Sequence, residues 1–124
     1  MEIGRGVKGL IMDGDQVLVL VEPNGTVDLP GGRVEEGEAL SVSLLREIRE
    51  ETDIDVKIDA PVADWRFMKA PGLEILGTTY LCKYVGGNVN LSHEHSGHYW
   101  IDLGRLYDPE FSRRGRMGVY IGAS

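Results

Sequence analysis

The sequence predicts an α+β fold in which a mixed or antiparallel sheet packs against one long helix. Strand-like segments lie on both sides of a single helix-forming segment, and no internal repeat, linker or low-complexity segment interrupts this order. The length of 124 residues fits one domain better than two, and contents of 42% apolar and 27% charged residues are typical of globular proteins. We therefore expect residues 1–124 to form a single domain.

The first half of the chain contains a predicted hairpin and the predicted helix. Residues 7–12 and 17–21 are apolar, β-branched-rich runs on either side of the turn-forming segment Asp13-Gly14-Asp15-Gln16. Residues 29–32, with the sequence Leu-Pro-Gly-Gly, are expected to lack regular structure. Residues 39–52 are good helix formers without internal Gly or Pro, which predicts one helix.

The second half of the chain consists mainly of predicted strands. Apolar and polar residues alternate in residues 54–58 and 98–103, as in half-buried strands. Residues 62–68 and 74–85 are further strand-like segments, separated by the turn-forming sequence Ala-Pro-Gly. Beyond residue 109 the pattern fits a short helix and an irregular tail equally well.

The composition argues against several classes of function. The formal net charge is −7, from 20 acidic and 13 basic residues, whereas sequence-independent binding of nucleic acid rests on basic patches. The longest aliphatic run, residues 17–21, is too short to span a bilayer, and the first residues do not resemble a signal peptide. The single cysteine, Cys82, cannot form an internal disulfide, and we expect it to be buried. These features indicate a cytoplasmic protein that binds neither nucleic acid nor membranes.

The predicted helix carries acidic side chains on the side that should face the core. Its apolar stripe consists of Leu40, Leu44 and Ile48. At about 100° per residue, the carboxylates of Glu47, Glu50 and Glu51 share one face of the helix, and two of them overlap this stripe. A merely solvated acidic face would lie on the opposite side, so this arrangement needs a further explanation.

These three carboxylates destabilise an isolated helix. They repel one another at spacings of three and four residues, and they lie toward the C-terminal half, where the helix dipole disfavours anions. A hard divalent cation would resolve the conflict, because Mg²⁺ and Mn²⁺ take oxygen ligands and share phosphate oxygens with a substrate. Ion pairs with nearby arginines, such as Arg46 and Arg49, are the alternative. The preceding Gly31-Gly32 favours the cation, because glycine lets the backbone approach a ligand closely.

The loop and the helix together resemble the Nudix box. Gly32 is followed by five residues, Glu38, seven residues and the segment Arg46-Glu47-Ile48-Arg49-Glu50-Glu51-Thr52-Asp53-Ile54. Every fixed position of the family pattern matches except one, because Asp53 stands where the family has glycine. Asp tolerates the left-handed conformation that commonly follows a helix, at a cost of about 1 kcal/mol. The resemblance implies a Nudix-like α/β/α sandwich with a mixed central sheet and the box helix packed on it.

The resemblance also implies an activity, the hydrolysis of a pyrophosphate bond in a nucleoside diphosphate linked to another group, with Mg²⁺ or Mn²⁺ as cofactor. The implied metal ligands are Glu47, Glu50, Glu51 and the Gly31 carbonyl. Arg46 would orient a glutamate of the box, and Gly32 and Glu38 would be structural. The general base is either Glu47 or Glu94. Many relatives use a glutamate outside the box, in a loop before the last strand, and Glu94, six residues before Trp100, is the equivalent in this sequence.

Several residues outside the box are candidates for binding the substrate. Trp65 and Phe67 fall on the same side of a predicted strand, where they either stack on a base or pack in the core. Arg33 and Arg66 either contact phosphates or are ordinary exposed charges. The histidines at positions 93, 95 and 98 lie in a Ser- and Gly-containing loop with no matching cluster elsewhere, and we interpret them as ordinary loop residues rather than metal ligands.

The sequence leaves the substrate open. We place a nucleoside triphosphate pyrophosphohydrolase first, and hydrolysis of ADP-ribose or a nucleotide sugar second. A Nudix-fold nucleotide sensor without turnover is the third interpretation, although such relatives typically lose glutamates of the box. The resemblance also implies that a homodimer is possible, since members of the family often form one.

Overall fold

A mixed sheet of seven strands forms the centre of the computed structural model, which describes residues 1–122. The strands are β1 (Glu2–Asp13), β2 (Gln16–Val21), β3 (Val27–Asp28), β4 (Gly31–Arg33), β5 (Asp55–Ala70), β6 (Leu73–Gly86) and β7 (Gly97–Asp102). The main order is β3-β2-β1-β6-β5, while β4 pairs with β1 and β7 pairs with β2. The long pair of β1 and β6 is parallel and the other pairs are antiparallel, which confirms the predicted mixed sheet.

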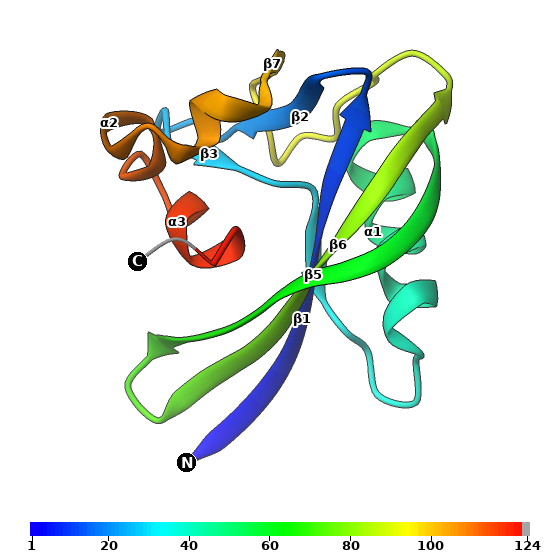
Figure 1. Ribbon diagram of the computed structural model, residues 1–124. Coiled ribbons are helices and arrows are strands. Elements are labelled where there is room, and N and C mark those ends of the chain that lie inside the picture. Colours follow the sequence, from blue (N-terminus) through cyan, green and yellow to red (C-terminus); the bar gives the residue numbers. More distant parts are fainter. Residues whose placement is uncertain (123–124) are drawn as a thin grey trace.

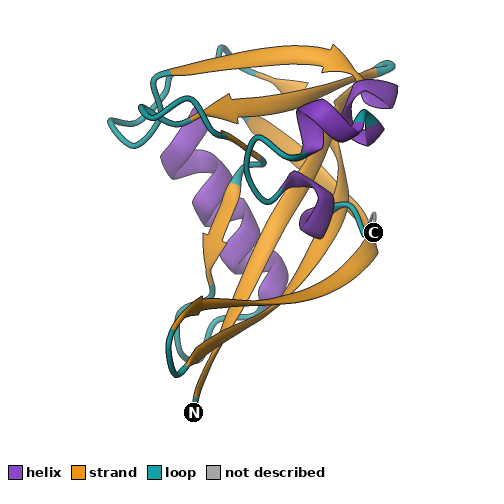
Figure 2. Ribbon diagram, turned by 90° about the vertical axis from the view of Figure 1, so that its left-hand side faces the viewer, coloured by secondary structure: helices purple, strands orange, loops and turns teal. Residues whose placement is uncertain are grey.

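Helices cover both faces of the sheet. The long helix α1 (Leu40–Thr52) packs on one face, in agreement with the predicted helix. The opposite face carries η1 (Leu103–Tyr107), α2 (Pro109–Ser112) and α3 (Met117–Tyr120). Figure 1 shows these short helices on the other side of the sheet from α1, and Figure 2 shows the same layers after a quarter turn. The tail after residue 109, which the sequence left open, therefore begins with two short helices.

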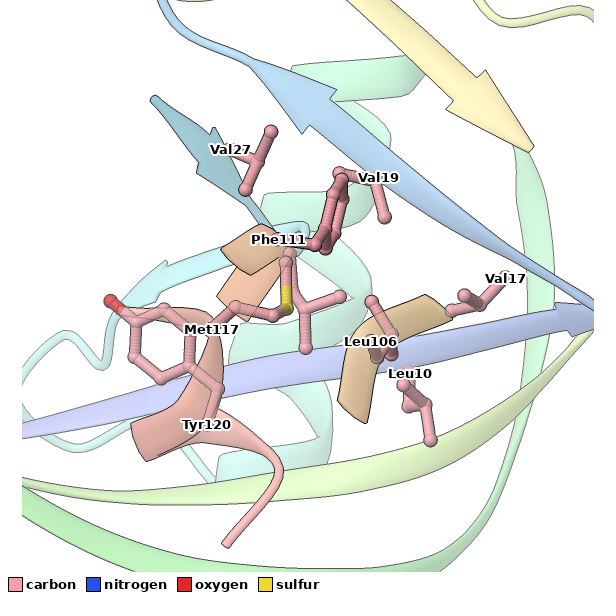
Figure 3. Packing of buried hydrophobic residues seen from close by; sticks show 9 residues of the cluster. Leu10, Val17, Val19, Val27, Leu106, Phe111, Met117 and Tyr120 are labelled. Atoms are coloured by element: carbon pink, nitrogen blue, oxygen red, sulfur yellow. The ribbon is translucent and has the colours of Figure 1, made fainter. Parts of the chain in front are cut away.

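Two apolar clusters hold these layers together. Between the sheet and α1, buried residues include Val7, Ile11, Leu44, Ile48 and Cys82. On the other face, side chains of η1, α2 and α3 pack against those of β1 and β2 (Figure 3). Cys82 is 1% exposed, as expected, and burial raises the pKa of its thiol to about 12. No helix within residues 1–122 is long and apolar enough to cross a membrane.

Two predictions about the strands are wrong. The segments predicted as separate strands at 54–58 and 62–68 form one strand from residue 55 onward, β5, which pairs with β6 through several register shifts. One shift lies beside Pro61, which has no N–H to donate and is tolerated at a bulge on this edge strand. Gly31 and Gly32, which we expected to lie outside regular structure, form β4 with Arg33 and pair with the middle of β1. The glycine loop is therefore held by the sheet.

The end of α1 agrees with the prediction for Asp53. This residue has a φ of 61° and is the one non-glycine residue with positive φ in residues 1–122. Its N–H donates to the Arg49 carbonyl at 3.0 Å and closes the last turn of the helix. The Asn90 amide donates to the Asp53 carboxylate at 3.3 Å. The left-handed turn after α1 is therefore formed without glycine.

Candidate active site

Glu51 connects α1 to the glycine loop. Its Oε1 accepts a hydrogen bond from the Gly31 N–H at 2.8 Å, and the residue is only 6% exposed. Gly31 is fixed by its pairing with Lys8 on β1, and the preceding Pro30 carbonyl accepts a hydrogen bond from the Gly9 N–H at 2.8 Å. Burial raises the pKa of Glu51 to about 8, although the Gly31 hydrogen bond and the charge of Lys8 act in the opposite direction. This environment disfavours the carboxylate unless another positive charge is present.

Arg46 holds several acidic side chains around one guanidinium. It donates to the Glu38 carboxylate at 2.8 and 3.0 Å, to Glu47 at 3.1 Å and to Glu50 at 3.3 Å. Its hydrogen bond is the main cause that lowers the pKa of Glu38 to about 2. Within residues 1–122, Glu51 forms no comparable ion pair. Ion pairs with Arg46 therefore neutralise Glu47 and Glu50. Glu51, the most buried of the three carboxylates, has no such partner among the described residues and needs another positive charge.

The three helix carboxylates form a series from the interior to solvent. Glu51 is buried, the Glu47 side chain is 17% exposed, and the Glu50 side chain is 58% exposed. Burial is also the first cause of the raised pKa of Glu47. Gly32 lies so close that a Cβ at this position would be 2.6 Å from the Glu47 carboxyl carbon. The glycine loop and the acidic face of α1 thus line one site, whose oxygen donors fit Mg²⁺ or Mn²⁺.

The loop before β7 brings Glu94 to this site. The Ser92 N–H donates to the Glu51 carbonyl at 3.2 Å, and the Ser96 N–H donates to the Val21 carbonyl at 2.8 Å, so the loop is anchored to α1 and to β2. Glu51, Glu94 and His95 each offer a ligand atom, and these atoms lie within 4.8 Å of one another. The exposed Glu94 also contributes to the raised pKa of Glu47. The Glu94 carboxylate therefore lies close enough to the glutamates of α1 to belong to the same site.

His95 differs from the other two histidines of this region in its burial. His93 is exposed and His98 is partly exposed, but His95 is 8% exposed and lies among carboxylates. Its Nδ1 is covered and has no hydrogen-bond partner within residues 1–122. The sequence of the loop carried no sign of this burial, because the loop is held by hydrogen bonds to residues far away in the chain.

Sequence reasoning also missed Lys8. It lies within an apolar strand and is 7% exposed, and its ammonium donates to Asp28 at 2.9 Å and to the Leu29 carbonyl at 3.1 Å. The same ammonium lies 4.8 Å from the centroid of the Tyr120 ring. Burial is the largest single influence and lowers the pKa of Lys8, but Asp28, Tyr120 and Glu51 together outweigh it, so the pKa is raised. A permanent positive charge therefore lies inside the sheet behind the glycine loop.

Of the predicted substrate-binding residues, three contact other side chains of the protein and one is exposed beside the glycine loop. Trp65 and Phe67 stack on each other with centroids 5.8 Å apart, and each forms a T-shaped pair with Tyr120. Trp65 also covers Gly77, where a Cβ would be 2.1 Å from the ring, so these contacts favour packing over base stacking. The exposed Arg66 side chain lies 3.8 Å from Glu74. Arg33 is exposed at the end of β4, beside the glycine loop.

Comparisons with known proteins identify the family to which this fold and site belong. The family model of the NUDIX domain matches residues 2–118. A MutT-like protein of Streptomyces ambofaciens is 31% identical over 97 residues, which cover 77% of this chain and 61% of that protein. The chain thus spans about three-fifths of the length of this curated relative.

Solved structures share the fold. A MutT protein from Methanosarcina mazei Go1 has a TM-score of 0.78 and 26% identity, with 90% of this chain and 88% of that chain covered. An ADP-ribose pyrophosphatase from Streptococcus suis has a TM-score of 0.69 and 22% identity, with 82% and 75% covered. At this lower identity the likeness concerns the fold alone.

Proposed function

This chain belongs to the Nudix hydrolase family, and on that basis we propose that it is a divalent-metal-dependent pyrophosphohydrolase of nucleotides. The observation that carries the proposal is the buried Glu51, which is tied to Gly31 and lacks a paired cation within residues 1–122, beside two further carboxylates of the same helix. A structural acidic helix would pair all three with arginine or expose them to water. A sensor without turnover would not need the complete set of glutamates.

Glu47, Glu50, Glu51 and the Gly31 carbonyl are the proposed metal ligands. A bound divalent cation would neutralise phosphate charge and lower the pKa of the attacking water. The role of Arg46 is to hold Glu47 and Glu50 on the metal side of the helix through its hydrogen bonds at 3.1 and 3.3 Å. Glu38 keeps the guanidinium in place and does not itself contact the substrate in this proposal.

Glu94 is the proposed general base, with Glu47 as the alternative. Two features support Glu94. Its side chain is exposed to an entering water, and its loop is anchored at both ends and brings it within 4.8 Å of ligand atoms of Glu51 and His95. Glu47 already accepts a hydrogen bond from Arg46, which makes its carboxylate a weaker base, whereas its burial makes it a stronger one. Replacing the base is expected to lower kcat and to remove the acidic limb of the pH–rate profile. Glu94→Gln is the discriminating variant, because Glu47→Gln also removes a proposed metal ligand: loss of the acidic limb in Glu94→Gln would support Glu94, and an unchanged limb would support Glu47.

The proposed substrate is a nucleoside triphosphate, and the alternative is ADP-ribose or a nucleotide sugar. The MutT-like protein and the MutT protein described above are 31% and 26% identical to this chain, whereas the protein named ADP-ribose pyrophosphatase shares the fold at 22% identity. The test is hydrolysis of a panel of nucleoside triphosphates, ADP-ribose, nucleotide sugars and dinucleotides, each with Mg²⁺, Mn²⁺ or EDTA. Chromatography of the nucleotide products is needed beside a pyrophosphate assay, because ADP-ribose and nucleotide sugars would yield a nucleoside monophosphate and a sugar phosphate without free pyrophosphate. We expect pyrophosphate from a triphosphate with metal only. Turnover of ADP-ribose or a nucleotide sugar instead would establish the alternative, and metal binding without any turnover would support a sensor.

A further inference from the structure

A second group of potential ligands lies outside the Nudix box. Glu22 at the end of β2, Asp28 in β3 and His95 in the loop before β7 each offer a ligand atom, and these atoms lie within 4.8 Å of one another. None of the three belongs to the segment from Gly32 to Ile54 that forms the box. His95 lies between this group and the box site, because Glu51 and Glu94 approach it as well.

His95 is the independent sign that this group binds a ligand. The residue is 8% exposed, and its Nδ1 is buried without a hydrogen-bond partner within residues 1–122. Buried polar atoms are nearly always paired, so an unpaired nitrogen on an imidazole that lies among carboxylates points to a further partner. A cation supplies such a partner, since a neutral imidazole nitrogen is a good metal ligand.

The two carboxylates keep oxygens available for a cation. Asp28 Oδ1 accepts the Lys8 ammonium at 2.9 Å, and Glu22 Oε2 accepts the Thr26 hydroxyl. The second oxygen of each carboxylate has no hydrogen-bond donor within residues 1–122. Lys8 offsets one of the two negative charges, so the group retains one net negative charge toward a divalent cation.

The backbone also fixes the positions of the ligands. His95 lies between two anchors of its loop, the Ser92 N–H on the Glu51 carbonyl and the Ser96 N–H on the Val21 carbonyl. The Ser96 hydroxyl lies 3.3 Å from the Glu22 carbonyl, and this contact ties the loop directly to the segment that carries Glu22. The ligands are therefore held together before any ion binds, which limits the ordering cost of binding.

We propose that Glu22, Asp28 and His95 form a second cation site, specific for a borderline transition metal such as Zn²⁺ rather than for Mg²⁺. One nitrogen and two carboxylate oxygens form a three-ligand set with an open fourth position, which suits Zn²⁺ and its chemical relatives. Mg²⁺ prefers an octahedral set of oxygens and accepts imidazole poorly. The box site offers oxygens and is expected to keep Mg²⁺ or Mn²⁺. The second site does not depend on the reaction of the first.

The test is a calorimetric titration of the full chain with Zn²⁺ in excess Mg²⁺, which is added to occupy the proposed box site. We expect one Zn²⁺ per chain to bind to the wild type. The affinity for Zn²⁺ should fall by at least roughly 10–100-fold in Glu22→Gln, which is the cost of losing a supporting metal contact, and binding should be lost in His95→Ala. Glu22→Gln keeps an oxygen for the Thr26 hydroxyl and so preserves the local fold. His98→Ala is the matched control, since His98 lies on β7 outside the group and its removal should leave Zn²⁺ binding unchanged.

Three results would overturn this proposal. The first is that Zn²⁺ fails to bind in excess Mg²⁺. The second is that Glu22→Gln binds Zn²⁺ as tightly as the wild type does. The third is that Glu50→Gln abolishes Zn²⁺ binding while Glu22→Gln does not. The third result would assign His95 to the box site. Far-UV circular dichroism of each metal-free variant shows that the fold is kept, and Co²⁺ absorption provides a second readout of nitrogen ligation. Neither readout involves turnover, so the proposed hydrolase activity can fail while the second site is present.

Discussion

Replacing Glu51 with glutamine is expected to stabilise the metal-free protein at neutral and alkaline pH. Glu51 is 6% exposed, and burial raises its pKa from 4.5 to about 8. Between these values the folded chain holds a proton that the unfolded chain has released, so the free energy of unfolding falls as pH rises. Glutamine is neutral at every pH and keeps an oxygen for the Gly31 N–H. The variant should therefore lack this fall.

The magnitude follows from the same shift. Each pKa unit corresponds to about 1.4 kcal/mol, so the wild type should lose up to ~5 kcal/mol of unfolding free energy between about pH 4.5 and pH 8 relative to Glu51→Gln. Below this interval the two proteins should be equally stable. Saturating Mg²⁺ should recover the stability of the wild type at about pH 8 and should leave the variant nearly unchanged.

Urea unfolding in EDTA at several pH values provides the assay. Glu50→Gln is the matched control, because its side chain is 58% exposed and its replacement should change stability by less than about 0.5 kcal/mol. If wild type and Glu51→Gln keep a constant difference across the pH range, or if the variant is the less stable protein at about pH 8, the carboxylate is not destabilised by burial and the reasoning is refuted.

Three further substitutions test individual contacts. Asp53→Gly should raise the free energy of unfolding by about 1 kcal/mol in urea, because φ is 61° at this position; a loss would show that the Asn90 contact outweighs the strain. Gly77→Ala should lower it by about 1–3 kcal/mol, since the new Cβ meets the Trp65 ring at 2.1 Å; an unchanged melting temperature would contradict this packing. Gly32→Ala should lower kcat by about 10–100-fold with little change in melting temperature, because its Cβ lies 2.6 Å from the Glu47 carboxyl carbon; unchanged kcat would contradict the close approach.

The sequence was most informative where function requires a local pattern. The acidic face of α1 follows from spacings of three and four residues within one helix, and the box spacing relates that face to the glycine loop. The left-handed Asp53 was likewise predictable, because helix ends have few conformations and glycine is the usual residue there. These features depend on neighbours within about one or two turns of helix.

Features that depend on distant residues could not be predicted. Gly31 and Gly32 form a strand only because the middle of β1, more than twenty residues earlier, pairs with them. The continuity of β5 was hidden by the register shifts around Pro61, which interrupt the alternation of apolar and polar residues. Lys8 and His95 gain their importance from partners such as Asp28 and Glu51, which no local pattern connects to them.

The most direct test of the central claim is the metal dependence of nucleotide hydrolysis in the wild type, Glu50→Gln and Glu51→Gln, measured on the substrate that the panel identifies. The claim is that these glutamates hold the catalytic cation. It predicts turnover by the wild type with Mg²⁺ or Mn²⁺, none in EDTA, and a loss of at least roughly 100-fold in both folded variants. Turnover that persists in EDTA, or that survives both substitutions, would contradict the claim.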